Sequence, residues 1–333
     1  MAAAPFSYMP TSSDGIHLTH FEEWMTDQVI ALSARLWSRD PNAESIRFRS
    51  TFEHPFQKSR AVRLVALADN EVCGFQSYVY WPYVRDGQVL HTLQSGWSMV
   101  APEHQGRRIF ARLLSYSWLP NYPHPADALI GFPLATSYGS LIRNGWVHIT
   151  DLAWMVRPII PLRIRRFRNP SDVPTGFDST PEPITPWHPP MVWSRLHDPA
   201  FSEWQTQAHG NPPWYFHFGY GNEAIRYQLR PRRRGVLTEL TIGDVLATTE
   251  DASALRVSLQ RLVAVARSCP LVAFLSLALN PGCADSSLLA CARSVGFRFV
   301  RRSVPFTAKA LAEGADINGA NSWRLLRSDI DTW

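Results

Sequence analysis

Long apolar runs, closely paired cysteines and a leader-like N-terminal pattern are all missing from this sequence of 333 residues. The longest apolar stretch, Leu271 to Leu279, is interrupted by Ser276 and is about half as long as the ~20 residues that a transmembrane helix needs. The first residues do not form a basic segment followed by an apolar one, so they do not predict a secretory signal. We therefore expect a cytoplasmic protein that has no membrane partner.

Cysteine is scarce, and its spacing does not suggest a metal centre or a disulfide framework. Cys73, Cys269, Cys283 and Cys291 form no C-x-x-C pair and no Cys/His cluster with zinc spacing. Cys73 falls in a strand-like run and Cys291 in a helix-like run, which is typical of reduced thiols in a core. We expect no metal.

Charged residues make up only 18% of the chain, below the usual ~25%, while 45% of its residues are hydrophobic, which excludes wholesale disorder. The formal net charge of +5 suits an anionic partner. Two groups of arginines, within 163–168 and 230–234, are not interleaved with aromatic residues as in a platform that binds single-stranded nucleic acid. Nucleic acid is therefore not an expected partner.

A proline-rich segment divides the chain. Nine prolines between Pro158 and Pro190 rule out a regular helix or a central strand there, so this segment predicts a surface linker. A chain of this length predicts about two domains. We place an N-terminal domain at 1–160, a linker at 161–195 and a C-terminal domain at 196–333.

Periodicity predicts the same order of elements in both halves: strand, strand, helix, strand, helix, strand. In the first half, two helices (21–36, 42–52) precede strands at 63–68, 72–81 and 89–100, a helix at 109–118, a strand at 128–132, a helix at 137–144 and a strand at 146–156. In the second half, strands at 224–229 and 236–246 are joined by an arginine loop, and a helix at 251–268, a strand at 271–279, a helix at 286–294 and a strand at 298–306 follow. We expect two mixed α/β domains, each with its own mostly antiparallel sheet.

The stretch from Ser98 to Leu114 carries the clearest chemical signal. A strand-like run ends at Val100, Pro102 interrupts it, a polar loop covers 103–108, and an apolar-faced helix begins at Ile109. The first backbone N–H groups of a helix have no acceptor within the helix, and the helix dipole favours negative charge there. This corner is therefore suited to a pyrophosphate.

The stretch resembles motif A of the GNAT superfamily of acyl-CoA transferases. Residues that match its V-x-P-x-x-[QR]-G-x-G-[IL] pattern and the following leucines are Val100, Pro102, Gln105, Gly106, Ile109, Leu113 and Leu114. The preceding strands and the later Gly145-Trp146 agree with it too, so the resemblance covers about residues 15–160. It implies an α/β (α+β mixed-sheet) fold with two GNAT-like domains in tandem, the second one degenerate because Ala247 to Asp251 replaces the Gln-Gly loop.

The resemblance implies an N-acyltransferase that moves an acyl group, by default from acetyl-CoA, to the amine of a small metabolite in a ternary complex. Other acyl-CoA donors remain open. The backbone of Met99 and Val100 would pair with the pantetheine arm, so the strand that ends near Val100 should diverge from its neighbour to admit this arm. Ser137 offers a nearby hydroxyl. The amides expected to hold the pyrophosphate belong to Gln105, Gly106, Arg107, Arg108, Ile109 and Phe110.

Three departures from the family pattern affect the expected chemistry. Arg108 replaces a common glycine, which we expect to be tolerated if its φ is negative. Leu134 and Leu141 stand where the family has Asn and Tyr, so Tyr138 becomes the candidate proton donor. His91 is a candidate base on the predicted strand that ends at Val100; water or a group from the second half is equally open.

The acceptor amine is expected in a groove between the halves, with Trp97 in its wall and Glu239 and Asp244 as carboxylates for a cationic amine. Two other functions remain open. One is a Fem-type transferase that uses aminoacyl-tRNA, which the two arginine groups would suit, and the other is an inactive binding module. The chain could be a monomer or a homodimer.

Overall fold

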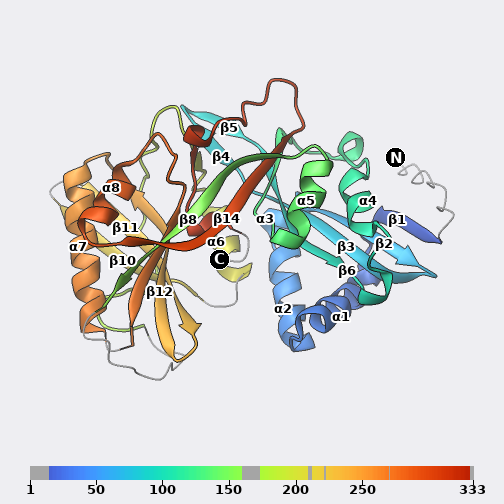
Figure 1. Cartoon of the computed structure of the whole chain (residues 1–333), viewed down its shortest axis with the longest axis horizontal. Coiled ribbons are helices and arrows are strands. Elements are labelled where there is room, and N and C mark those ends of the chain that lie inside the picture. The colour runs from blue at the N-terminus through green and yellow to red at the C-terminus, as the bar shows by residue number, and fades with distance from the viewer. Residues whose placement is uncertain (1–14, 160–172, 209–211, 221–222, 270, 331–333) are drawn as a thin grey trace.

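The computed structural model describes residues 15–159, 173–208, 212–220, 223–269 and 271–330 (Figure 1). In the first half, a twisted sheet contains β1 (Ile16–His20), β2 (Val62–Ala68), β3 (Glu71–Tyr80), β6 (Thr92–Val100) and β7 (Ala128–Gly131). Consecutive residues of a strand face opposite sides of the sheet. Phe75 of β3 accordingly packs against Phe48, whereas a Cβ at Gly74 would touch Ile109 on the opposite side.

Helices therefore cover both faces of the first half. On one face lie α1 (Thr26–Trp37), α2 (Pro41–Phe52) and the short α3 (Pro55–Lys58); the other face carries α4 (Ile109–Ser115), and α5 (Ala135–Arg143) lies beside α4. The sequence explains α2 locally: Asp40 caps its N-terminus by accepting from the Ala43 amide, and Pro41 occupies the first helical position. Phe48 and Phe52, one turn apart, are fully buried and anchor the helix to the sheet.

The second half repeats this arrangement. Its sheet contains β10 (Trp214–Tyr220), β11 (Glu223–Arg234), β12 (Leu237–Ala247) and β13 (Phe274–Leu279), with α7 (Ala252–Ser268) and α8 (Ser287–Ser294) on one face. Helix α6 (Pro199–Ala208) lies between the halves, where Trp204 Nε1 donates to the Thr51 carbonyl of α2 at 2.9 Å. The predicted arginine loop is wrong: β11 runs through Arg234, and the turn is at Gly235 and Val236.

The two halves exchange their last strands, β8 (Val147–Pro158) and β14 (Arg298–Ala310), which run side by side through the middle of the molecule (Figure 1). The end of β8 pairs with β13, and the end of β14 pairs with β7. The expectation of one separate sheet per half is therefore wrong. Eleven strands form one continuous sheet in the order β1-β2-β3-β6-β7-β14-β8-β13-β12-β11-β10.

A second, small sheet ties the end of the proline-rich segment and the C-terminal segment to the first half. It contains β4 (Tyr83–Arg85), β5 (Gln88–Leu90), β9 (Trp193–Arg195) and β15 (Trp323–Arg324) in the order β15-β9-β4-β5. A 3-10 turn, η5 (Arg327–Asp329), follows β15 and is buried. Residues 161–172 of the predicted linker lie outside the described residues, so the predicted domain limits stay a prediction.

Two limited observations bear on membranes and metals. None of the described helices is both long and apolar enough to cross a bilayer. Among the same residues, no three His, Cys, Asp or Glu side chains are grouped so that they could hold a metal ion.

Candidate functional site

Strands β6 and β7 diverge in the middle of the first half. They pair in parallel only from Thr92 to Gln94, opposite Ala128 to Ile130, and β7 ends one residue later at Gly131. Strand β6 continues to Val100, so this edge of 95–100 faces no neighbouring strand among the described residues. The predicted divergence of the strand that ends at Val100 is confirmed.

A β-bulge lies in β6 beside the open edge. Its register against β3 shifts between the pairs Gly96–Ser77 and Met99–Phe75, and Trp97 adopts a left-handed backbone with φ of 50°. Such a conformation is rare for a bulky residue. Here it accompanies the β-bulge, which bends the strand locally. Polar groups that the sequence did not single out line the bulge: Gln76 donates to Ser95 Oγ at 3.0 Å and accepts from Ser98 Oγ at 2.6 Å.

The Trp97 side chain is packed in the core of the first half. Its ring packs edge-on against Phe48 and Phe52 of α2, and the Arg47 guanidinium lies 4.5 Å from its centroid. Only a void of about 20 Å³ adjoins it. The structure thus places Trp97 on the α2 side of the sheet, in a packed aromatic cluster rather than in the wall of an open groove.

The Gly106 loop, residues 105–108, links the end of β6 to α4 and is exposed. Gly106 has φ of 81°, and a Cβ built there would meet nothing within 4 Å. Arg108 has φ of 58°, so the condition under which we expected arginine to be tolerated here, a negative φ, is not met. The loop keeps left-handed geometry although arginine pays a steric cost for it of about 1–2 kcal/mol. Helix α4 then begins at Ile109, and its first amides have no acceptor within the helix.

Helix α5, which follows β7, carries Ser137 and Tyr138. Tyr138 is half-buried, and its ring lies edge-on to His148 with the centroids 6.1 Å apart. Ser137 Oγ donates to the Leu134 carbonyl at 3.1 Å. Leu134 is 74% exposed and Ile142 is 37% exposed. Because Leu134, Tyr138 and Ile142 are four residues apart, they form one partly exposed apolar face of this helix.

His91 lies just before β6, at the far end from the loop. Its Nδ1 is 2.8 Å from Tyr80 Oη, and its backbone N–H donates to Asp127 at 2.8 Å. Six residues of strand separate it from Trp97 at the bulge, which corresponds to about 20 Å. The structure therefore does not bring His91 to the open edge.

The second half has the same divergence, but a segment of the chain fills it. Strands β12 and β13 pair only from Glu239 to Ile242, opposite Phe274 to Leu277, whereas β12 continues to Ala247. Leu326 forms a β-bridge with Leu279 at the end of β13, and Arg324 Nη2 donates to the Val245 carbonyl of β12 at 2.9 Å. The C-terminal segment 324–329 thus occupies the place that stays open in the first half.

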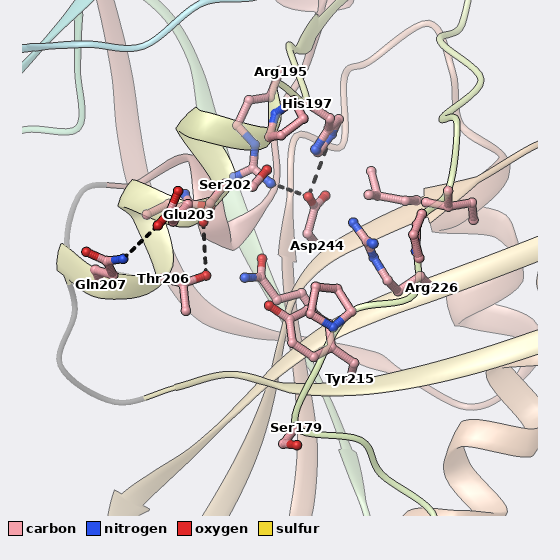
Figure 2. A pocket seen from close by; sticks show the side chains of 17 residues that line it. Ser179, Arg195, His197, Ser202, Glu203, Thr206, Gln207, Tyr215, Arg226 and Asp244 are labelled. Carbon is pink, nitrogen blue, oxygen red and sulfur yellow. Dashed lines mark hydrogen bonds and ion pairs between the residues drawn. The ribbon is translucent and has the colours of Figure 1, made fainter. Parts of the chain in front are cut away.

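A cavity of about 560 Å³ lies beside this filled divergence (Figure 2). It is enclosed by residues 179–184 of the proline-rich segment, by α6 and by the faces of β10, β11 and β12 that point away from α7. Its polar lining residues include Arg195, His197, Tyr215, Arg226, Gln228 and Asp244. Of the carboxylates that the sequence singled out, Asp244 lies here.

Asp244 is already neutralised within the protein. Its carboxylate forms an ion pair with Arg195, and Oδ2 is 3.7 Å from His197 Nε2 (Figure 2). Burial alone would raise the pKa of Asp244, but the attraction of Arg195, His197 and Arg324 outweighs burial and lowers this pKa to about 2. Burial lowers the pKa of His197 to about 3, so that imidazole is neutral near pH 7. Asp244 is therefore engaged rather than waiting for a cationic amine.

Glu239 does not belong to the cavity lining. It is 2% exposed and forms an ion pair with Arg234. Five residues of β12 separate it from Asp244, a distance of about 15 Å along the strand. The structure brings only one of the two predicted acceptor carboxylates to a cavity.

Sequence reasoning missed the cavity residues Arg226, Tyr215 and Gln228. A signal was present, because Arg226 and Gln228 alternate with Ile225, Tyr227 and Leu229, which are 1%, 0% and 0% exposed. That alternation predicts a strand with one polar face over a core on the other.

Comparisons with known proteins agree with this architecture. No protein-family model and no curated protein matches the sequence. The structure is similar to a GCN5-related N-acetyltransferase from Anabaena variabilis, with 12% identity, a TM-score of 0.58 and coverage of 88% of this chain and 72% of that one. It is also similar to a tandem GNAT protein from the clavulanic acid biosynthesis pathway, with 13% identity, a TM-score of 0.51 and coverage of 90% and 99%.

The chain has the tandem GNAT fold. Yeast (Saccharomyces cerevisiae) N-myristoyltransferase with bound myristoyl-CoA is similar over 98% of this chain and 91% of that one, at 9% identity and a TM-score of 0.54. Within this fold, the first half has the open divergence and the Gly106 loop, whereas in the second half the segment 324–329 fills the corresponding place.

Proposed function

We propose that this protein is an N-acyltransferase that moves an acyl group, acetyl by default, from acyl-CoA to the amine of a small metabolite. The observation that carries the proposal is the open edge of β6 next to the Gly106 loop. An unpaired strand edge can accept an extended partner through backbone hydrogen bonds. Met99 and Val100 would pair with the pantetheine arm there.

The same site would hold the remaining parts of the donor. Loop amides from Gln105 to Phe110 would bind the pyrophosphate, and Arg107 and Arg108 would flank it with positive charge. The exposed apolar face of α5, formed by Leu134, Tyr138 and Ile142, would cover apolar parts of the arm. In the second half, the segment 324–329 takes up the corresponding space, which supports a single donor site.

The reaction needs positioning and two proton transfers. The acceptor nitrogen attacks the thioester carbonyl, the new C–N bond forms, and the C–S bond breaks. In this proposal the proton lost by the amine passes to water. The departing thiolate takes a proton from Tyr138 on α5. No covalent intermediate on the protein is required.

The acceptor would enter from the cavity in the second half. Arg195 and Gln205 of that cavity both donate to the Ser328 carbonyl, at 3.1 and 2.8 Å. The next residue, Asp329, accepts from Gln94 Nε2 at 2.6 Å, and Gln94 is the last β6 residue that pairs with β7. A short chain of hydrogen bonds therefore joins the cavity wall to Gln94 of β6.

The tRNA-dependent alternative loses one of its supports. Arg230, Arg232 and Arg234 lie within β11 rather than in a loop that could follow an RNA backbone, and most of the other arginine group lies outside the described residues. The proposal is tested by calorimetric titration with acetyl-CoA, CoA and longer acyl-CoAs, followed by assays of free thiol release with a panel of amines. Tight CoA binding without turnover would favour the inactive binding module, and the absence of CoA binding would refute the donor site.

A further inference from the structure

The cavity in the second half has apolar walls and one polar end. Pro181, Pro183, Ile184 and Leu246 supply apolar surface, and its volume of about 560 Å³ is that of a small-molecule site, typically about 300–1,000 Å³. At the polar end, Tyr215 of β10 stands directly opposite Gln228 of β11, and Arg226 lies two residues along the same strand. These three side chains share the face of the sheet that lines the cavity.

The charges around this end do not cancel at Arg226. Arg195 and Asp244 neutralise each other, and His197 is neutral. Glu203 stands at the exposed rim, where it accepts from Gln207 on the same helix at 3.1 Å. The Arg226 guanidinium donates from Nη1 to the backbone carbonyl of Glu182 and has no carboxylate within ion-pair distance among the described residues. Arg226 is half-buried in the cavity lining, where its positive charge favours an anionic ligand.

Two neutral groups at the same end also lack partners. Tyr215 is 5% exposed, yet its hydroxyl makes no hydrogen bond with any described residue, and neither does the Gln228 amide. The Arg226 guanidinium lies 5.9 Å from the centroid of the Tyr215 ring, and Gln228 lines the same cavity. A guanidinium, a phenolic hydroxyl and an amide that line one cavity can donate hydrogen bonds to an oxyanion.

Two more arginines follow on the same strand. Arg230 and Arg232 lie on the same face of β11 as Arg226. Burial, and after it the neighbouring charge of Arg232, lower the pKa of Arg230 to about 9. Glu239 offsets one charge through its ion pair with Arg234.

We propose that this cavity binds the anionic group, a carboxylate or a phosphate, of a small organic molecule through Arg226 and Tyr215. That this molecule is the acyl acceptor rests on the proposed function. The acceptor class is then an amine that also carries an acidic group, rather than a polyamine. The apolar walls hold its carbon skeleton while its anionic end lies at Arg226.

Calorimetric titration of the full chain with inorganic pyrophosphate, malonate and uncharged glucose tests the binding. At least one anion should bind, and glucose should not. Arg226→Gln should weaken anion binding about ten- to a hundredfold, as expected for the loss of a charge-assisted contact. Arg233→Gln is the matched control, because Arg233 is an exposed arginine of the same strand; it should leave the affinity unchanged.

The result would overturn the inference if neither anion binds, or if Arg233→Gln weakens binding as much as Arg226→Gln. Should Arg226→Gln fail to fold, Tyr215→Phe decides the question, because it removes only the hydroxyl; it should weaken anion binding several-fold, and unchanged affinity would contradict the proposal. If only pyrophosphate binds, the anionic group of the ligand is a phosphate. If only malonate binds, it is a carboxylate.

Pyrophosphate also suits the Gly106 loop, so the titrations are repeated in Gly106→Val. If the heat of pyrophosphate binding persists in Gly106→Val but is lost in Arg226→Gln, pyrophosphate binds in the cavity. The converse pattern assigns it to the loop and overturns the cavity site for phosphate. If CoA fails to bind while the cavity still binds an anion, the proposed function fails and the anion site stands.

Discussion

Substitution of Gly106 is the sharpest test of the donor site. Gly106 has φ of 81°, and a valine there would strain the backbone by at least about 1–2 kcal/mol. The loop would relieve this strain by turning toward negative φ, which moves the amides on both sides of residue 106. Two displaced amides, each worth about 1.5–3 kcal/mol toward a charged phosphate, would weaken CoA binding about 10²–10⁴-fold.

The flanking arginines provide the comparison. Arg107→Ala or Arg108→Ala removes one guanidinium and leaves the amides in place, so either should weaken CoA binding only about ten- to a hundredfold. We therefore expect Gly106→Val to have the largest effect of the three. Calorimetric titration of each variant with CoA measures this ranking.

Gly87→Val is the matched control for backbone strain. Gly87 has φ of 77°, and like Gly106 it has nothing within 4 Å of a built Cβ, but it lies in the turn between β4 and β5. This variant should lose similar stability while binding CoA like the wild type. If all three loop variants bind CoA normally, or if Gly87→Val weakens binding as much as Gly106→Val, the reasoning about the loop is refuted.

Three further predictions follow from the geometry. Tyr138→Phe should lower kcat about 10²–10⁴-fold with little change in the KM for acyl-CoA, and near-native kcat in steady-state assays would remove Tyr138 from the mechanism. Arg108→Gly should raise the free energy of unfolding by up to about 1 kcal/mol in urea titrations, because glycine relieves the left-handed strain at φ of 58° but orders at a larger entropy cost; a clear loss of stability would contradict it. The folded protein keeps His197 neutral down to about pH 3, so only the unfolded chain takes up this proton as the pH is lowered below about 6.5. The free energy of unfolding should therefore decrease by up to about 1.4 kcal/mol for each unit by which the pH is lowered. In denaturation at several pH values, His197→Gln should show a shallower decrease between about pH 6.5 and 4, and an unchanged slope would refute this assignment.

Several elements of the first half could be predicted from the sequence because they depend on interactions within a few residues. The loop from Pro102 to Arg108 and the start of α4 at Ile109 follow from proline, glycine and apolar spacing, which act within a few residues. The divergence of β6 from β7 could also be expected, because it belongs to the resemblance. Arg108 shows the limit of this approach: its residue type favours negative φ, but the surrounding loop imposes φ of 58°.

The pairing of strands that lie far apart in the sequence could not be predicted from the sequence. The alternation in β8 and β14 predicts two strands but does not say which strands they will pair with, so their exchange between the halves could not be foreseen. The small sheet is made of segments only two or three residues long, too short for any periodicity. The arginine-rich composition of 230–234 suggested a loop, but these residues continue strand β11 to its end at Arg234.

The difference between the halves follows from how each satisfies an open strand edge. Backbone N–H and C=O groups that leave a sheet need other partners. In the second half, Leu326 and Arg324 supply them at the ends of β13 and β12, so that edge is already closed by the chain. In the first half, β6 has no such segment beside it among the described residues, and its edge remains available to a ligand. Because Arg195 and Gln205 of the cavity both donate to the Ser328 carbonyl of the closing segment, the segment that closes this edge also holds one wall of the cavity in place.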